Sequence, residues 1–290
     1  MFENMQIGKQ IELPFIGSNP ELVSRRVRSS TNSRLQELRV RGRRPSLPAG
    51  LRFYAIGDIH GRLDLLNELL ALINHDIALR STVRPVYIFL GDYIDRGPSS
   101  RATVDKLIEH GLTNESIFLK GNHELIALKC LSDRNLFEQW LRLGGLETLI
   151  SYGLTPESAA SGKQIVELQA AFHNALPRAH FRFFGELQNS FACGDFFFAH
   201  AGVKPNVELS RQKESDLLWI RDEFLSSSHD FGKIIVHGHT PVSEIEVGPN
   251  RINIDTGAFA TGRLTCLILE GESVSIIDTS SDPCRKQSGS

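Results

Sequence analysis

The chain has 290 residues, of which 41% are hydrophobic and 23% charged, and its formal net charge at pH 7 is −2. These values are typical of a globular protein with one large domain or two small ones, and they exclude disorder over the whole length. The near-neutral charge argues against nucleic acid as the main partner, and no stretch approaches the ~18 apolar residues that a membrane-spanning helix requires.

Residues 1–50 predict an arginine-rich extension. Nine arginines and a single acid, Glu37, lie between Arg25 and Arg52. Like charge and low hydrophobicity are typical of a flexible segment. The alternative is a basic arm that contacts an acidic partner or a membrane surface, and the sequence leaves both open. Residues 280–290 predict a second flexible tail.

From Leu51 onward, short apolar runs alternate with helical patterns, which predicts an α/β fold with helices covering a central sheet. Residues 51–279 are expected to form this domain, with a mainly helical insertion at 124–187. The predicted helices are Asp64–Leu79 and Arg101–His110. The predicted strands are Leu51–Ile56, Val86–Leu90, Ile117–Leu119, Phe196–Ala199, Ile234–Val236, the segment around Ile252 and Ile254, Leu264–Leu269 and Val274–Ile277.

Five of the predicted strands run into polar loops. Ligands of α/β proteins bind at the carboxyl ends of strands, so these loops are expected to converge. A single aspartate after a strand is commonly a turn or capping residue, but five such loops in succession are not explained by capping. The loops read GDIHG at 57–61, GDYIDRGP at 91–98, GNHE at 121–124, HAG at 200–202 and HGHTP at 237–241.

The side chains in these loops predict a metal site. Asp58 and His60 are two residues apart and could face one ion, because alternate residues of an extended segment point the same way. Asp92 could bridge two ions. Mixed oxygen and nitrogen ligands suit Mn²⁺, Fe or Zn²⁺, and two ions ~3.5–4 Å apart can make a hydroxide and hold both oxygens of a displacement at phosphorus. The remaining candidate ligands are Asn122, His200 and His239.

The five loops together resemble the motif blocks of the calcineurin-like metallophosphoesterases, and within them the bacterial type of the phosphoprotein phosphatase (serine/threonine phosphatase) family. The resemblance extends from Leu51 to Ile277. It implies a β-sandwich flanked by helices and a hydrolase that uses two divalent metal ions, with Mn²⁺ expected to support activity in vitro. It also implies the ligand sets: Asp58 and His60 for the first metal, Asp92 as the bridge, and Asn122, His200 and His239 for the second.

The resemblance further implies the catalytic roles. His123 is the general acid, paired with Asp95, because a carboxylate facing an imidazole favours its protonated form. Arg96 and Asn122 bind phosphate, and Arg221, in a shorter and more variable block, is a second phosphate-binding arginine. His237 is interpreted as a strand-end residue beside the ligand His239.

The implied function is a serine/threonine or dual-specificity protein phosphatase that acts on phosphorylated proteins or peptides. Two alternatives stay open. One is a symmetrical diadenosine tetraphosphate hydrolase, although such enzymes usually lack the pair Asp95-Arg96 and carry Asp where this chain has Glu124. The other is an inactive scaffold that binds partners through the arginine-rich arm.

A cytoplasmic location is expected. The first 20 residues lack the basic and apolar segments of a secretory signal. Four widely spaced cysteines, with no Cys-x-x-Cys pair, predict reduced thiols rather than a disulfide framework; they are Cys130, Cys193, Cys266 and Cys284.

Overall fold

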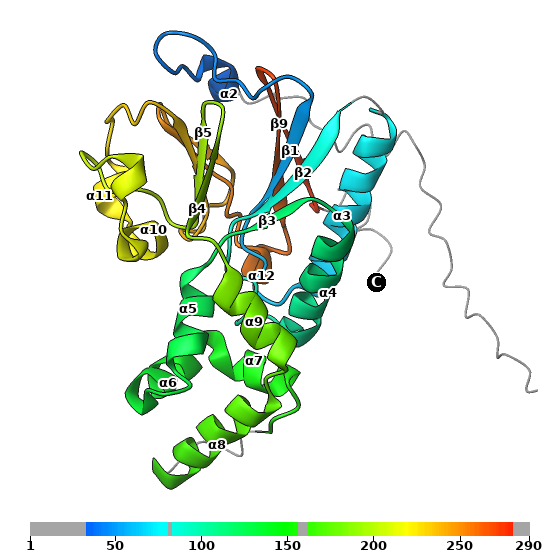
Figure 1. Cartoon of the computed structure of the whole chain (residues 1–290), viewed down its shortest axis with the longest axis vertical. Helices are drawn as coiled ribbons and strands as arrows, with labels where there is room; N and C mark the ends of the chain where they lie inside the picture. Colours follow the sequence, from blue (N-terminus) through cyan, green and yellow to red (C-terminus); the bar gives the residue numbers. More distant parts are fainter. Residues whose placement is uncertain (1–32, 81–82, 156–161, 281–290) are drawn as a thin grey trace, which may run out of the picture.

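The computed structural model describes residues 33–80, 83–155 and 162–280, and its centre is a pair of β-sheets with helices around them (Figure 1). Each sheet has five strands. The strands are β1 (Leu51–Ile56), β2 (Arg84–Phe89), β3 (Ser116–Phe118), β4 (Ser190–Cys193), β5 (Phe196–Ala199), β6 (Ile234–His237), β7 (Glu246–Val247), β8 (Arg251–Asn253), β9 (Thr265–Glu270) and β10 (Ser273–Asp278).

The order of strands in the two sheets brings several carboxyl ends to one side. The first sheet has the order β10-β9-β1-β2-β3, and the second has β4-β5-β6-β8-β7. β1, β2 and β3 are parallel to one another, as are β5, β6 and β8. The remaining strands, β4, β7, β9 and β10, pair antiparallel with their neighbours. The predicted sandwich of sheets flanked by helices is thereby confirmed.

Helices cover the outer faces of the sandwich and form a separate group below it in Figure 1. The stretch in which the insertion was expected contains six helical segments, from α5 to α9. The described helices are α2 (Ser33–Glu37), α3 (Leu63–Ala78), α4 (Ser100–Thr113), α5 (Asn122–Lys129), α6 (Arg134–Trp140), the π-helical turn η1 (Leu141–Gly145), α7 (Leu146–Ser151), α8 (Gly162–Ala175), α9 (Arg178–Glu186), the 3₁₀ turn η2 (Leu209–Arg211), α10 (Glu214–Trp219), α11 (Asp222–Leu225) and α12 (Ala258–Thr261).

Strand β1 shows how the apolar runs produce this layering. Phe53 and Ala55 belong to the core between the two sheets. Tyr54 and Ile56 point the other way, into the core beneath α3 and α4. Successive side chains of a strand face opposite sides of the sheet, so a strand covered on both faces must be apolar throughout. This is why residues 53–56 of β1 carry no charge, while the buried Arg52 of the same strand requires acidic partners.

The segment before β1 differs from the expected flexible extension. Residues 1–32 of that extension lie outside the described part, but residues 33–50 pack against the sandwich. Leu35, Leu38, Val40 and Leu47 are at most 5% exposed and join the core between the sheets. This packing was not predicted because the four apolar side chains are spaced among arginines and do not form a run.

Polar contacts hold the same segment in place. Arg43 donates to both carboxylate oxygens of Asp195, at 2.5 and 2.8 Å. The backbone N–H of Leu47 donates to the carbonyl of Gly271, and that of Asp195 to the carbonyl of Ser46. The last arginine of the basic stretch, Arg52, pairs with Asp76 and Glu270. At least two of the arginines therefore neutralise acids of the chain itself.

Deleting residues 1–49 should lower the free energy of unfolding by several kcal/mol, because it removes four buried apolar side chains worth ~1.5–3 kcal/mol each. Leu38→Ala alone should cost about 2–5 kcal/mol. Urea unfolding of both variants checks this. Activity toward a small aryl phosphate should persist wherever the variants stay folded, since the loops at 57–241 supply the site. A truncated chain as stable as the whole one would contradict the packing described here.

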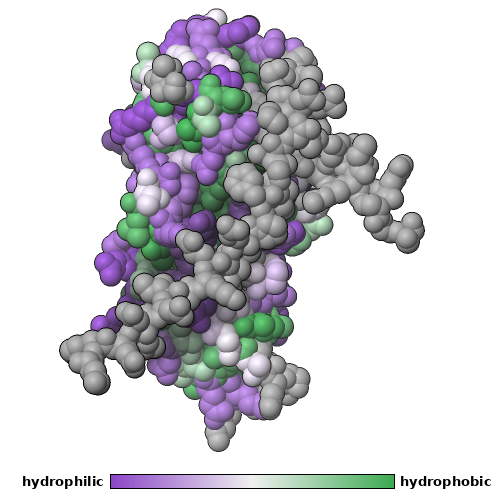
Figure 2. All heavy atoms as spheres, turned by 90° about the vertical axis from the view of Figure 1, so that its right-hand side faces the viewer, coloured by the Kyte–Doolittle hydropathy of each residue, from purple (hydrophilic) through white to green (hydrophobic). Residues whose placement is uncertain are grey.

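Among the described residues, none of the helices combines the length and apolar character needed to cross a membrane. Figure 2 looks at the side that carries α3 and α4. Hydrophilic residues cover most of the described surface in that view, and hydrophobic residues appear in separate small areas.

Candidate metal centre and active site

The site lies where the loops after β1, β2, β3, β5 and β6 meet, and the backbone there is strained. Seven described non-glycine residues have a positive φ, and five of them belong to these loops. Such conformations cost of order 1–3 kcal/mol and persist where surrounding contacts impose them, commonly at functional sites. The five are His60, Asp92, Asp95, Arg96 and His239.

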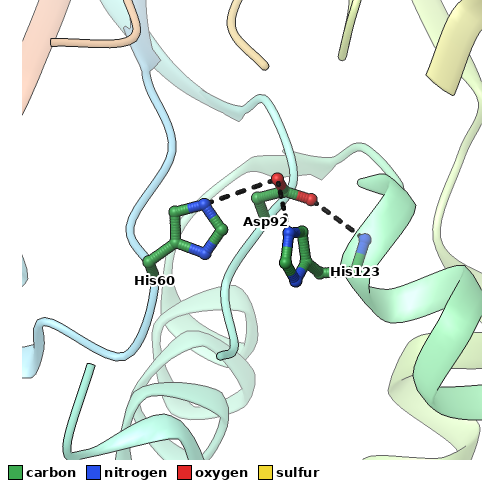
Figure 3. Close-up of side chains that lie close together, drawn as sticks. All are labelled: His60, Asp92 and His123. Atoms are coloured by element: carbon green, nitrogen blue, oxygen red, sulfur yellow. Dashed lines mark hydrogen bonds and ion pairs between the residues drawn. The ribbon is translucent and has the colours of Figure 1, made fainter. Parts of the chain in front are cut away.

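Asp92 lies between two groups of histidines. Its Oδ2 is 3.5 Å from Nε2 of His60 and 3.8 Å from Nε2 of His123, as Figure 3 shows. Its Oδ1 is 3.4 Å from Nε2 of His200. Burial would raise the pKa of Asp92, but the nearby imidazoles hold it well below its usual value. One carboxylate oxygen faces each group, which is the arrangement a bridging ligand requires.

Two histidines are oriented by hydrogen bonds at their far nitrogen. Nδ1 of His60 lies 2.8 Å from the carbonyl of Ile94, and Nδ1 of His200 lies 2.9 Å from the carbonyl of Leu90. An Nδ1–H that donates to a carbonyl fixes the tautomer and leaves Nε2 as an acceptor or ligand. Both Nε2 atoms face the site.

Asn122 joins the second group. Its Oδ1 is 2.9 Å from Nε2 of His200 and 2.9 Å from Nδ1 of His239. Ligand atoms of Asp92, His200 and His239 all lie within 4.8 Å of one another, and so do those of His60, Asp92 and His123. The structure thus brings together two sets that could each hold an ion.

Asp58 lies beside these sets but is not a member of either group of three. Its Oδ2 accepts the backbone N–H of His239 at 3.0 Å. Its Oδ1 is buried without a hydrogen-bond partner among the described residues. A Cβ at Gly238 would come within 2.0 Å of that oxygen, so only glycine leaves room for it. Burial first, and then the charges of Asp255 and Asp92, raise the pKa of Asp58 well above its usual value.

The residues present fit two cations. Five carboxylates are 0–2% exposed within this small region, and buried like charges are costly unless cations neutralise them. Burial would lower the pKa of His200, yet the charge of Asp92 and its hydrogen bond raise it to about 10. Oδ1 of Asp58, which has no hydrogen-bond partner among the described residues, adds an oxygen that could bind a metal ion. The five carboxylates belong to Asp58, Asp92, Asp95, Glu124 and Asp255.

The two residues predicted to form an acid dyad contact each other next to the first group. Nδ1 of His123 lies 2.6 Å from Oδ2 of Asp95, and both side chains are buried. Burial would lower the pKa of His123, but the charge of Asp92 and the bond to Asp95 outweigh it and raise that pKa. The bond to Asp95 thus favours the protonated form of His123, which is the form that a general acid needs.

The structure places the two predicted arginines differently. The guanidinium of Arg96 is half-buried, with Nη1 3.0 Å from Nε2 of His60 and Nη2 3.1 Å from Nε2 of His123. Arg221 is exposed immediately before α11. Burial chiefly, and then the charges of His200 and Arg221, lower the pKa of His239 to about 2. Arg221 is near enough to act on the site electrostatically, while Arg96 lies inside it.

His237 lies apart from the two groups. It is the last residue of β6, it is fully buried, and its ring packs edge-on against Phe224 with 5.0 Å between ring centres. Its Nδ1 is 3.1 Å from the carbonyl of Gly238. The position agrees with a strand-end residue.

Two acidic residues of the site were missed as functional positions. The carboxylate of Glu124 accepts backbone N–H groups from Asp92, Tyr93 and Gly121 at 2.7–2.9 Å, which ties the second and third loops together. Asp255 follows β8 and accepts the N–H of Gly257 at 2.9 Å. A polar residue directly after an apolar strand was the signal available for Asp255, as it was for the other loops.

Two aromatic side chains flank the site, and the sequence pattern did not single them out. Trp219 is 43% exposed, and its ring centre is 6.2 Å from that of His239. Phe259 is 36% exposed and lies 5.4 Å from the ring of His60, with the guanidinium of Arg96 4.8 Å from its ring centre. The rim of the site thus offers aromatic surface on both sides.

Comparison with known proteins agrees with this geometry. The chain is 28% identical over 244 residues to the asymmetrical bis(5'-nucleosyl)-tetraphosphatase PrpE of Anoxybacillus flavithermus, covering 77% of this chain and 93% of the relative. It is also 28% identical over 222 residues to serine/threonine-protein phosphatase 2 of Escherichia coli, covering 73% and 90%.

Among solved structures, a putative diadenosine tetraphosphatase superposes with a TM-score of 0.52 at 17% identity, covering 83% of this chain and all of that one. At this identity the likeness concerns the fold alone. The model of the calcineurin-like phosphoesterase family matches residues 51–264, which include the five loops. Members of this family depend on a dinuclear metal centre, and the described His and Asp groups are able to hold metal. The chain belongs to the calcineurin-like phosphoesterases.

Proposed function

We propose that this chain is a two-metal serine/threonine protein phosphatase, with Asp58, His60 and Asp92 at one ion and Asp92, Asn122, His200 and His239 at the other. Two bound cations supply a nucleophile from water and neutralise charge on the phosphoryl oxygens. Arg96, with Asn122 and Arg221, binds those oxygens, and the planar guanidinium of Arg96 suits two of them at once.

The observation that carries the proposal is the dyad of His123 and Asp95. The alkoxide of serine or threonine is a poor leaving group and needs a proton as the P–O bond breaks. A histidine with a raised pKa, bonded to a buried carboxylate at 2.6 Å, is suited to supply that proton. A nucleotide phosphate leaves readily without one, so the dyad favours alkyl phosphomonoesters.

His123→Asn should keep both metals and slow a phosphoserine peptide far more than p-nitrophenyl phosphate. General acid catalysis contributes roughly 10²–10⁴-fold, and only the poor leaving group depends on it. With Mn²⁺ supplied, the measurement is the ratio of kcat on the phosphoserine peptide to kcat on p-nitrophenyl phosphate. An equal loss on the two substrates would remove His123 from the role of acid.

A second candidate is hydrolysis of a dinucleoside tetraphosphate. The specific observation in its favour is the pair of exposed aromatic side chains, Trp219 and Phe259, because bases stack on such rings with ~1–3 kcal/mol each. Relatives named PrpE carry a tetraphosphatase activity in their names. Those names specify asymmetrical cleavage, so this candidate is not restricted to the symmetrical reaction.

A direct competition of substrates separates the two functions. The whole chain, loaded with Mn²⁺, is assayed for phosphate release from a panel of phosphoserine, phosphothreonine and phosphotyrosine peptides and for nucleotide release from diadenosine tetraphosphate. We expect the higher kcat/KM on the peptides. A tenfold preference for the dinucleotide would replace the first proposal with the second. An inactive scaffold is disfavoured because the loops bring all the predicted metal-binding residues together.

The cytoplasm is the proposed location, since the described cysteines, Cys130, Cys193 and Cys266, are free thiols. Cys284 lies outside the described residues. The proposed partner is a phosphorylated protein or peptide. An acidic partner for the arginine-rich arm remains a prediction that concerns mainly residues 1–32.

A further inference from the structure

Every oxygen of the Asp95 carboxylate is engaged, and most of its partners come from the helical segments after α5. Oδ2 accepts from Nε1 of Trp140 at 2.8 Å as well as from His123. Oδ1 accepts from the hydroxyl of Thr148 at 2.6 Å. Trp140 ends α6 and Thr148 lies in α7, 45 and 53 residues away along the chain.

The same segments also hold the backbone of the Asp95 loop. The N–H of Asp95 donates to the hydroxyls of Thr148 at 2.9 Å and Ser100 at 3.0 Å. The N–H of Arg96 donates to the carbonyl of Gly144 at 3.0 Å. Asp95 and Arg96 have φ values of 72° and 67°, which non-glycine residues adopt only where contacts impose them.

The close contact at Gly144 restricts the backbone of the loop that contains Asp95 and Arg96. Gly144 itself has a φ of 109°, and a Cβ there would lie 2.7 Å from Cγ and 2.8 Å from the backbone nitrogen of Arg96. The turn between α6 and α7 is therefore shaped around Arg96. The strained loop of Asp95 and Arg96 therefore packs directly against the turn that contains Gly144.

The donors themselves are rigid. Trp140 is fully buried, with its ring 5.0 Å from that of Phe172 and 5.7 Å from that of Phe137. Thr148 is 1% exposed. Hydrogen bonds from side chains locked by packing fix the direction of the group they contact, which is how supporting residues set the geometry of an active site.

We propose that Trp140 and Thr148 are positioning residues that fix both oxygens of the Asp95 carboxylate, so that Asp95 holds His123 in the orientation for proton donation to a poor leaving group. Neither residue touches the reacting atoms. The inference rests on the proposed role of His123 as general acid, and it assigns to the helical segments a catalytic purpose that the loop motifs do not contain.

Thr148→Val and Trp140→Phe test this. Thr148→Val keeps the shape of the side chain and removes its hydroxyl, whereas Trp140→Phe removes the indole N–H together with part of the buried ring. Each should lower kcat on a phosphoserine peptide roughly 10- to 100-fold, the range typical of supporting partners, and lower kcat on p-nitrophenyl phosphate less than threefold. Thr148→Ser keeps the hydroxyl and should restore the wild-type ratio. Two metals per chain and cooperative unfolding well above the assay temperature show that the fold and the centre are intact.

The matched control is Thr103→Val. Thr103 is equally buried, lies in the adjacent helix α4, and has a hydroxyl without a partner among the described residues. This variant should leave the ratio of the two rates unchanged. If it shifts the ratio as much as Thr148→Val does, the effect comes from helix packing and the proposed role is overturned.

The double variant His123→Asn/Thr148→Val makes the test specific. With the acid already absent, removing the Thr148 hydroxyl should change the ratio no further. A further fall would show that Thr148 acts by another route. If His123→Asn shifts the ratio and neither Trp140→Phe nor Thr148→Val does, this inference alone is lost. If His123→Asn itself leaves the ratio unchanged, the acid role and the inference fail together. A preference for the dinucleotide over peptides, measured on the unaltered chain, bears on the proposed substrate and is read independently of these variants.

Discussion

Asp92→Asn is expected to abolish activity and to leave fewer than two metal ions per chain. One carboxylate oxygen of Asp92 faces the His60 group and the other faces the His200 group, at 3.5 and 3.4 Å. An amide supplies no negative charge, and its nitrogen cannot replace the second carboxylate oxygen as a metal ligand. Because the nucleophile depends on both ions, kcat should fall by several orders of magnitude. Elemental analysis and kcat on an aryl phosphate give the two readings.

Asp255→Asn is the matched control for this result. Asp255 is as buried as Asp92 and lies in the same region, but its carboxylate accepts an N–H of its own turn and belongs to neither group of ligand atoms. It should keep two metals. Full metal occupancy in Asp92→Asn would contradict the role of Asp92 as a bridging ligand. So would a loss of metal in Asp255→Asn while Asp92→Asn loses no metal.

The second large effect is expected at the two histidines that flank Gly238. His239→Ala should empty or weaken one metal position and lower kcat by several orders of magnitude, since Nδ1 of His239 lies 2.9 Å from Oδ1 of Asn122, within the second group. His237→Ala should keep both metals and cost at most the roughly 10- to 100-fold typical of residues that support ligands. Its ring packs on Phe224 instead.

Metal content and kcat of the two variants are to be measured side by side. Both remove an imidazole from the same loop, so a general disturbance of that loop affects them alike. The opposite pattern, with metal lost in His237→Ala and kept in His239→Ala, would show that the ligand of this block has been assigned to the wrong residue.

Much of the candidate metal centre could be predicted from the sequence because each proposed ligand sits in a local pattern. An apolar strand followed at once by a polar loop is visible within about ten residues, and β1 and β5 were predicted with the bounds that the structure has. Parallel strands then place the loops together. The residue types that could hold an ion, such as Asp58, His60 and Asp92, can therefore be recognised from short stretches of sequence.

The contacts between those loops and the rest of the chain could not be predicted in this way. Glu124 was noted only as a motif residue that separates two families, yet it binds three backbone N–H groups from two loops. Trp219 and Phe259 read as scattered aromatic residues, yet they flank one centre from α10 and α12. Which surfaces meet depends on how separate elements pack, and no short pattern records it.

The residue types of the candidate site follow from the local sequence, since the identity of a proposed ligand and its place after a strand are local properties. The contacts that support those residues depend on tertiary packing. Leu35 and Leu38 are buried because the sandwich offers them an apolar surface, and Trp140 and Thr148 reach Asp95 across 45 and 53 residues of chain. Burial and long-range hydrogen bonds gain their free energy from packing between distant segments, so they exist only once the whole chain has folded.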